Sequence, residues 1–209
     1  MKKFELTSEF VKNALGTKLF RIKALVKFGD VIAGELGGYV EKEENLAQDG
    51  DAWVYGNAEV YGNAEVYGDA KVYGDACVLD NAEVYGDAWV YGNAKVYGDA
   101  WVLDNAKVCG NAEVCGNAKV CGNAEVYDNA DYSTVKGFGR FFRTTTFFRK
   151  EDKDIGVSCG CFYGTLDEFR DKVRETHGDS KTAKEYLMLA DLMEYKFSRE
   201  MDVEEEVNQ

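Results

Sequence analysis

Small and branched apolar side chains recur along the middle of the chain with a period of six residues. Ala occupies every sixth position from Ala52 to Ala130, which makes fourteen repeats without a slip, and Val occupies every sixth position from Val54 to Val126. The repeating unit reads Ala-x-Val-Tyr-Gly-Asn/Asp, with polar or aromatic residues at the variable position. Self-similarity of this length is the signature of a repeat architecture, so the pattern predicts a solenoid.

Each six-residue unit predicts one short extended side followed by one corner. Ala and Val lie two positions apart, so on an extended segment their side chains point to the same side, while the residues between and after them point to the other. Gly followed by Asn or Asp then forms the corner, because these residues tolerate the left-handed backbone of a tight turn. A single unit cannot bury its own apolar side, so the units must coil and stack.

The repeat resembles that of the hexapeptide-repeat proteins, which fold as a left-handed parallel β-helix. The resemblance rests on Val54-Tyr55-Gly56-Asn57-Ala58-Glu59 and its copies and covers residues 49–131. It implies a mainly β solenoid in which three hexads form one triangular coil of 18 residues. Fourteen hexads would then give about four and a half coils, stacked at the ~4.8 Å spacing of neighbouring strands.

A coil of 18 residues predicts which outward side chains lie above one another. One column contains Trp53, Lys71, Trp89 and Lys107, in which cation–π contacts would alternate along the stack. The neighbouring column contains Tyr55, Tyr73 and Tyr91, and Trp101 belongs to a different side of the coil. One corner stacks Asp51, Asp69 and Asp87.

The segments on either side of the repeat predict α+β caps at both termini. Residues 1–48 form the N-terminal α/β cap, and residues 132–209 form a module of two strands and two helices. In the first, we expect a helix from Ser8 to Leu15, a strand over residues 18–28, a turn at Gly29-Asp30 and an extended run over residues 31–40. In the second, we expect strands over residues 143–150 and 155–162. A first helix starts at the capping box Thr165-Leu166-Asp167-Glu168 and ends near His177-Gly178. A second helix runs from Asp179 or Ser180 to about Arg199 and is followed by a frayed tail at Glu204-Glu205-Glu206. The second helix buries an apolar face that consists of Tyr186, Ala190, Met193 and Phe197.

The charge of the chain disfavours two classes of partner. The formal net charge is −13, and the repeats carry most of it, with nine Asp and five Glu against four Lys over residues 51–131. Non-specific binding to nucleic acid or to anionic membranes needs Lys and Arg, so neither is expected. No run is long and apolar enough to span a membrane, and no apolar segment follows Lys2 and Lys3 as in a signal peptide. We therefore expect a cytoplasmic protein whose six Cys are reduced thiols.

Candidate catalytic and metal-binding residues are scarce. The hexapeptide-repeat acyltransferases that the chain resembles bind acyl-coenzyme A between subunits and use a His base, often with a loop inserted between coils. Here the hexads run without insertion or His, and the only His is His177, at the expected end of a helix. One His cannot form a three-His zinc site. Cys109, Cys115 and Cys121 would fall on three different faces, and the Cys159-Gly160-Cys161 segment is interpreted as core, so we predict no catalytic residue, metal or cofactor.

The outward columns are the candidate binding residues. An exposed aromatic surface is typical of a binding surface or an oligomer contact, although cross-strand stacking alone also favours such residues. The Asp column favours hydrogen bonds to corner amides, with a hard cation such as Ca²⁺ as the alternative. Homo-oligomer contact and recognition of another molecule both remain open for the Trp, Lys and Tyr columns.

These observations favour a non-enzymatic binding or scaffold protein with a protein partner, either a host protein or another copy of the chain. The segments Gly34–Tyr39 and Val157–Phe162 resemble uncharacterised hexapeptide-repeat proteins of bacteria and their phages. That resemblance implies a phage or prophage accessory factor that binds and inhibits a host protein through acidic, Tyr-rich faces. The alternatives are an acyl-coenzyme A-dependent acyltransferase with an inter-subunit site and a structural, self-assembling homo-oligomer.

Overall fold

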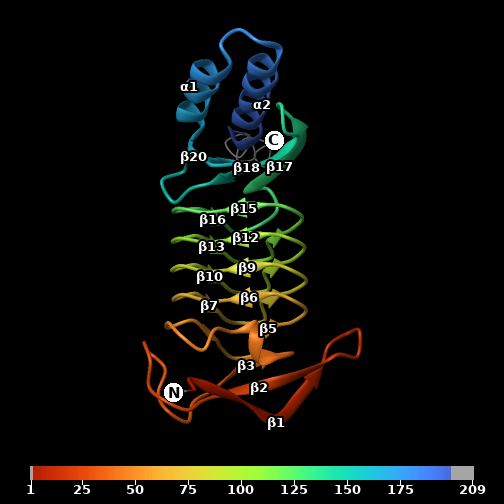
Figure 1. The fold of residues 1–209 in the computed structure, drawn as a ribbon, viewed down its shortest axis with the longest axis vertical. Helices are drawn as coiled ribbons and strands as arrows, with labels where there is room; N and C mark the ends of the chain where they lie inside the picture. The colour runs from red at the N-terminus through yellow and green to blue at the C-terminus, as the bar shows by residue number, and fades with distance from the viewer. Residues whose placement is uncertain (1, 199–209) are drawn as a thin grey trace, which may run out of the picture. The chain divides into compact units, whose positions relative to one another are not determined.

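The computed structural model describes residues 2–198, which fold as two compact units (Figure 1). The first unit covers residues 1–129 and contains the solenoid together with the N-terminal strands, and the second covers residues 130–209. No helix within the described part of the chain is long and apolar enough to cross a membrane. The two units are described separately below.

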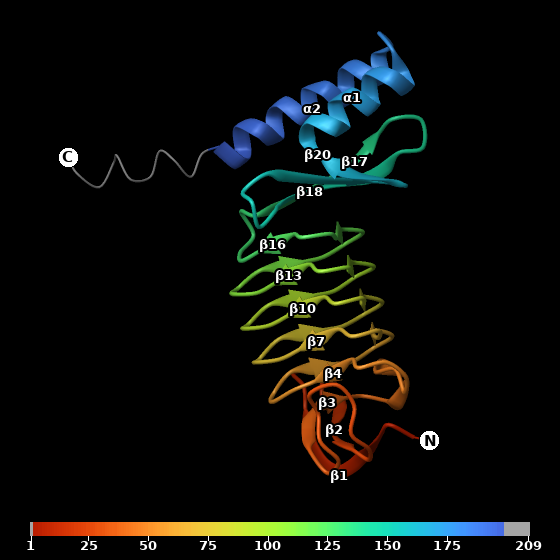
Figure 2. The same ribbon diagram turned by 90° about the vertical axis from the view of Figure 1, so that its left-hand side faces the viewer.

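The hexads form a parallel β-solenoid of about five coils, as the 18-residue period predicts (Figure 2). Thirteen of the fourteen hexads contribute one two-residue strand each. Strands 18 residues apart pair in parallel, as Trp89 does with Lys71 and Lys107. The thirteen strands lie in three sheets, ordered β16-β13-β10-β7-β4, β15-β12-β9-β6 and β14-β11-β8-β5. Their bounds are β4 (Trp53–Val54), β5 (Glu59–Val60), β6 (Glu65–Val66), β7 (Lys71–Val72), β8 (Cys77–Val78), β9 (Glu83–Val84), β10 (Trp89–Val90), β11 (Lys95–Val96), β12 (Trp101–Val102), β13 (Lys107–Val108), β14 (Glu113–Val114), β15 (Lys119–Val120) and β16 (Glu125–Val126).

The interior of the solenoid consists of the repeated Ala and Val side chains. From Ala52 to Val126 every one of them is buried, which confirms the predicted orientation of the hexad. Backbone hydrogen bonds join adjacent coils, for example from the Trp89 amide to the Ala106 carbonyl at 2.9 Å. The corners are formed by glycines with positive φ, as predicted, and by Asp80 and Asp104, which adopt φ of 62° and 61° at two of the three corners where Asp stands in place of Gly.

The N-terminal segment is built from strands, and the predicted helix from Ser8 to Leu15 is wrong. The segment contains β1 (Phe4–Lys12), β2 (Lys18–Ala24), β3 (Leu36–Val40) and the short 3-10 helix η1 (Glu43–Asn45). Strand β1 pairs antiparallel with β2, and its register shifts between Leu6 and Phe10, around Ser8. The apolar residues of β1 therefore find their partners on a strand that a local helix signal does not reveal.

Strand β3 joins the N-terminal strands to the solenoid. It pairs antiparallel with β2 and parallel with β5, so the sheet containing β5 continues outward through β3 and β2 to β1. Side chains at Gly37 and Gly38 would collide with the first coil, because a Cβ there would lie 2.6 Å from the carbonyl oxygens of Val54 and Ala58 respectively. The paired glycines thus allow this strand to lie directly against the coil.

A buried lysine fastens the N-terminus to the first coil. The Lys3 ammonium donates to the carbonyl oxygens of Asp49, Gly50 and Ala52 at 3.0–3.3 Å and lies 4.9 Å from the centre of the Phe28 ring. Burial lowers the pKa of Lys3 from 10.5 to about 8, although neighbouring Asp carboxylates oppose this shift. The folded protein therefore releases this proton at a lower pH than the unfolded chain does.

This shift predicts a pH dependence of stability. Between about pH 8 and 10.5 the unfolded chain holds a proton on Lys3 that the folded chain has lost, so the free energy of unfolding gains a contribution that rises with pH. We subtract the unfolding free energy of a Lys3→Met variant from that of the wild type, both measured in urea titrations. We expect this signed difference to rise between pH 7.5 and 9.5. A difference that stays constant or shrinks over this range would contradict the assignment, and the subtraction cancels the other titrating groups.

The second unit contains four strands and two helices, whereas two strands were predicted. An antiparallel sheet is formed by β17 (Tyr132–Phe138), β18 (Arg143–Arg149), β19 (Ile155–Cys159) and β20 (Phe162–Thr165) in sequence order. Strand β17 was missed, and the run expected as one strand over residues 155–162 divides at Gly160, whose φ of 62° forms a turn. Cys159 and Cys161 consequently flank this turn and do not lie on one strand.

The helices of this unit agree with the sequence prediction. Helix α1 (Leu166–His177) begins with the expected capping box, in which the Thr165 hydroxyl accepts from the Glu168 amide at 3.2 Å and the Glu168 carboxylate accepts from the Thr165 amide at 2.8 Å. Helix α2 (Lys181–Ser198) follows, and its predicted apolar face is buried. That face consists of Tyr186, Ala190, Met193 and Phe197. Arg199 and the tail predicted to fray at Glu204–Glu206 lie outside the described residues.

Candidate functional site

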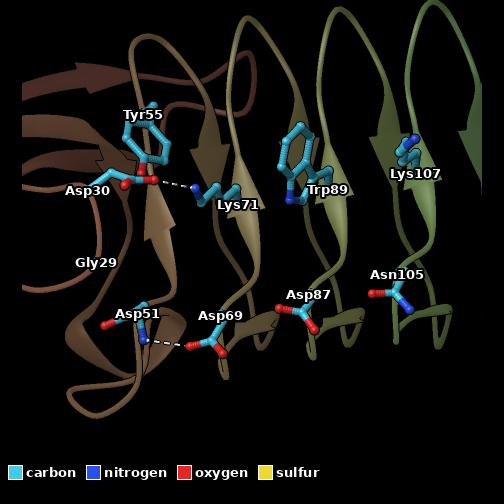
Figure 3. Close-up of a pocket in the computed structure, with 10 residues that line it drawn as sticks. All are labelled: Gly29, Asp30, Asp51, Tyr55, Asp69, Lys71, Asp87, Trp89, Asn105 and Lys107. Atoms are coloured by element: carbon cyan, nitrogen blue, oxygen red, sulfur yellow. Dashed lines mark hydrogen bonds and ion pairs between the residues drawn. The ribbon is translucent and has the colours of Figure 1, made fainter.

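A groove of about 550 Å³ runs along the outer side of the sheet formed by β4, β7, β10 and β13 (Figure 3). Its walls come from the Trp–Lys column, the Asp column, Tyr55 of the Tyr column and the turn that precedes β3. The lining residues are Gly29, Asp30, Asp51, Tyr55, Asp69, Lys71, Asp87, Trp89, Asn105 and Lys107. The groove therefore gathers the Lys, Trp and Asp columns that the 18-residue period places side by side.

The Lys and Trp side chains alternate along one wall of the groove. The Lys71 ammonium lies 5.7 Å from the centre of the Trp89 ring, as expected for a cation–π contact, and forms an ion pair with Asp30 at 2.8 Å. Lys107 forms an ion pair with Glu125 on the next coil at 2.7 Å. Trp89 remains 39% exposed, so its ring offers an apolar surface between two ammonium groups.

Hydrogen bonds shift the pKa values of three charged groups in or beside the groove. The bond to Asp30 raises the pKa of Lys71, and the same bond lowers the pKa of the Asp30 carboxyl. The bond from Lys107 lowers the pKa of Glu125. Burial raises the pKa of Tyr55, so its hydroxyl stays protonated near neutral pH. Asp30 and Glu125 bind the two ammonium groups through exposed or half-buried ion pairs. Breaking such pairs costs little free energy, so an anionic ligand can compete for the ammonium groups.

The Asp column forms the opposite wall. Asp51, Asp69 and Asp87 stack at successive corners, with Asn105 continuing the column (Figure 3). The Asp69 carboxylate accepts from the Asp51 amide at 3.1 Å, which is the corner bonding that the sequence favours for this column. The groove thus has a cationic, aromatic wall and an acidic wall.

Trp53 does not belong to the exposed column, contrary to the prediction. Its side chain is fully buried, because Phe4 and Phe28 of the N-terminal segment cover it with ring centroids 6.1 and 5.3 Å away. Its register with Lys71 is as predicted, but the first coil is the one that the N-terminal strands cover. Trp53 is therefore a core residue and not a binding residue.

The remaining predicted residues flank the groove or lie elsewhere. Tyr73 and Tyr91 stack with their ring centroids 4.9 Å apart, and Tyr73 contacts the Trp89 ring edge-on. Trp101 lies in β12, on a different sheet, where Lys119 is 5.5 Å from its ring centre. The Tyr73–Tyr91 stack follows the predicted Tyr column, and none of these contacts adds a residue to the lining of the groove.

The Gly29-Asp30 turn lines the groove, a position that the sequence does not predict. The turn itself was predicted, yet its position beside the coil depends on how β2 and β3 pair. A Cβ at Gly29 would lie 3.1 Å from the Asp51 carboxylate, so a larger residue at this turn would press against the acidic wall. The only available signal was the pairing of Gly with Asp, which indicates a turn but not what the turn contacts.

The only His lies in the second unit. His177 is the last residue of α1, as predicted, and its ring stacks on Tyr186 with centroids 5.9 Å apart. Cys109, Cys115 and Cys121 follow β13, β14 and β15, which belong to three different sheets. The described residues contain no cluster of three or more His, Cys, Asp or Glu arranged to hold a metal.

Comparison with known proteins changes the functional interpretation. No family model matches the chain. The chain is 42% identical over 62 residues to a protein of Escherichia coli (strain K12) described as the uncharacterized acetyltransferase YdcK. The match covers 26% of this chain and only 19% of that protein. The interpretation as a non-catalytic binding or scaffold protein is contradicted by this similarity, which supports the acyltransferase alternative instead.

Proposed function

We propose that the protein is an acyl-coenzyme A-dependent acyltransferase whose coenzyme site lies in the groove along β4, β7, β10 and β13. The observation that carries the proposal is the 42% identity to a protein described as an acetyltransferase. The groove supports it, because its ammonium groups and exposed indole match the phosphates and adenine ring of coenzyme A.

The two walls of the groove would contact different parts of the reactants. Lys71 and Lys107 are two coils apart, about 10 Å along the stack at ~4.8 Å per strand, with Trp89 between them. An adenine ring would stack on the exposed Trp89 face while the ammonium groups contact phosphates. The acidic wall repels phosphates, so it would instead attract the cationic amine of an acceptor.

The reaction this arrangement would support is acyl transfer to a nucleophile. The nucleophile attacks the thioester carbonyl carbon, the carbon–sulfur bond breaks, and coenzyme A leaves as a thiol with the proton that the acceptor gives up. The lining contains carboxylates and no imidazole. A second copy of the chain would close the open side of the groove, as the resemblance to hexapeptide-repeat acyltransferases implies for an inter-subunit site.

Calorimetric titration with acetyl-coenzyme A tests the proposal. We expect binding to the wild type and about tenfold weaker binding to Lys107→Gln, since a lost charged hydrogen bond costs ~1.5 kcal/mol or more. Lys95→Gln is the matched control, because Lys95 also pairs with a Glu one coil further on, at 3.1 Å, but lies on a different sheet outside the groove.

The outcomes separate the competing interpretations. Absence of acetyl-coenzyme A binding, or equal losses in Lys107→Gln and Lys95→Gln, would reject the groove as the coenzyme site. Binding that His177→Ala abolishes while Lys107→Gln preserves would move the site to the second unit. Sedimentation of the wild type over a range of concentrations, with and without the coenzyme, measures whether a second copy is needed.

A further inference from the structure

A second cavity, of about 820 Å³, lies within the C-terminal unit. It is formed by α1, by the start of α2, by the segment that connects β17 to β18 and by the turn between β19 and β20. Its lining residues are Arg140, Phe141, Arg143, Cys159, Cys161, Phe162, Phe169, Lys172, Val173, Thr176, His177, Thr182 and Tyr186. A volume of this size is typical of a site for a small molecule.

The charged side chains that line this cavity are all basic. Arg140, Arg143 and Lys172 line it, and the lining contains no Asp or Glu, although the whole chain carries a formal charge of −13. Within residues 2–198 neither arginine forms an ion pair with a carboxylate. Their guanidinium groups instead lie 5.5 and 5.0 Å from the centre of the Phe141 ring, which is itself 66% exposed. The cavity therefore offers two guanidinium groups with unused hydrogen-bonding capacity toward an anion.

The apolar part of the lining is aromatic. Phe169 contacts Phe162 and Tyr186 with ring centroids 5.6 and 5.7 Å apart, and His177 stacks on Tyr186. The Tyr186 hydroxyl donates to the Phe138 carbonyl at 3.3 Å, so its polar end is already satisfied and its ring is left to pack. Aromatic faces of this kind bind planar apolar groups by offset or edge-on stacking.

We propose that the C-terminal unit binds a small aromatic anion, with its planar apolar body against the Phe162, Phe169 and Tyr186 rings and its oxyanion on Arg140 and Arg143. Planar guanidinium groups match carboxylates and similar oxyanions through paired hydrogen bonds. The proposal is independent of the acyltransferase function, since it rests on residues of the C-terminal unit alone.

Two fluorescent probes with the same ring skeleton test this site in the full chain. 8-Anilinonaphthalene-1-sulfonate carries a sulfonate, whereas N-phenyl-1-naphthylamine lacks it. We expect the sulfonate to bind with one molecule per chain and at least tenfold more tightly than the neutral probe. Arg143→Gln should remove most of this preference, and Arg174→Gln is the matched control, because Arg174 lies on α1, pairs with Asp171 and is absent from the lining.

Each outcome decides for or against the proposal. Equal affinity for the two probes, or no saturable sulfonate binding, would overturn it without any variant being made. Equal loss in Arg143→Gln and Arg174→Gln would also overturn it, because a general effect of chain charge would then explain the preference. If Arg143→Gln fails to fold, Arg140→Gln replaces it, since Arg140 lies in an exposed connection between strands.

Discussion

Replacing Val96 with Asp is expected to lower the free energy of unfolding by at least about 3 kcal/mol, enough to remove a large part of the stability of an ordinary domain. Val96 is fully buried and pairs with Val78 and Val114 in the coils on either side. A carboxylate there would lose its hydration among the buried Ala and Val side chains of the interior. Because each coil contacts only its neighbours, the damage should spread along the stack from this point.

The neighbouring residue provides a matched control for this experiment. Lys95 precedes Val96 on the same strand but points outward, where its ion pair with Glu113 is exposed. Lys95→Ala should change the free energy of unfolding by less than about 1 kcal/mol. Val96→Thr keeps the shape of Val and adds a buried hydroxyl, so it should fall between the two, at ~1–3 kcal/mol. Urea unfolding followed by circular dichroism measures all three, and an Asp variant as stable as Lys95→Ala would disprove the inward orientation.

The repeat could be predicted well because every hexad buries its Ala and Val side chains in the same way. An alternating pair such as Ala94 and Val96 has only one way to bury its side chains in a stacked coil, so pattern alone determines orientation and register. The N-terminal segment has no such redundancy. The helix signal at Ser8 was overridden by pairing with β2, whose residues lie six to twenty positions from their partners on β1.

The candidate groove could be predicted only in part. The 18-residue period places Lys71, Trp89 and Lys107 in one column, and the structure has that register. The same period places Trp53 outward, yet the N-terminal strands bury it, because periodicity describes a coil and not what covers the coil. The contact of Asp30 with Lys71 likewise depends on tertiary pairing.

The chemistry was the least predictable part of the molecule. Stacking of the coils constrains the inward residues of each hexad. It does not constrain whether an outward side chain binds a ligand, reacts or does neither. The basic cavity of the C-terminal unit shows the same limit. Arg143 and Cys159 belong to β18 and β19, and His177 ends α1, so the sequence gives no sign that they line one space. Function here depends on outward residues, whereas the repeat pattern describes the inward ones.

The corners of the solenoid give the second large effect, which we expect for Gly74→Ala. Gly74 has φ of 76°, and a Cβ there would lie 2.9 Å from the Gly92 carbonyl oxygen in the next coil. Gly116 has a similar φ of 68°, but a Cβ there would meet nothing within 4 Å. Both Ala variants carry the left-handed strain of ~1 kcal/mol, and Gly74→Ala adds the cost of displacing a rigid backbone, ~1–3 kcal/mol.

The chain itself suggests how this cost is offset. At the corners formed by Asp80 and Asp104, which have a Cβ and positive φ, the carboxylates accept from the amides of Gly98 and Gly122 in the next coil at 3.1 and 3.0 Å. Gly74→Asp could make the same bond to the Gly92 amide, so it should lose less stability than Gly74→Ala despite its larger side chain. Thermal unfolding of the three variants tests this order. If Gly74→Asp proves as unstable as Gly74→Ala, the capping bond contributes nothing, and if Gly74→Ala only matches Gly116→Ala, the coils do not pack as closely at this corner as the structure shows.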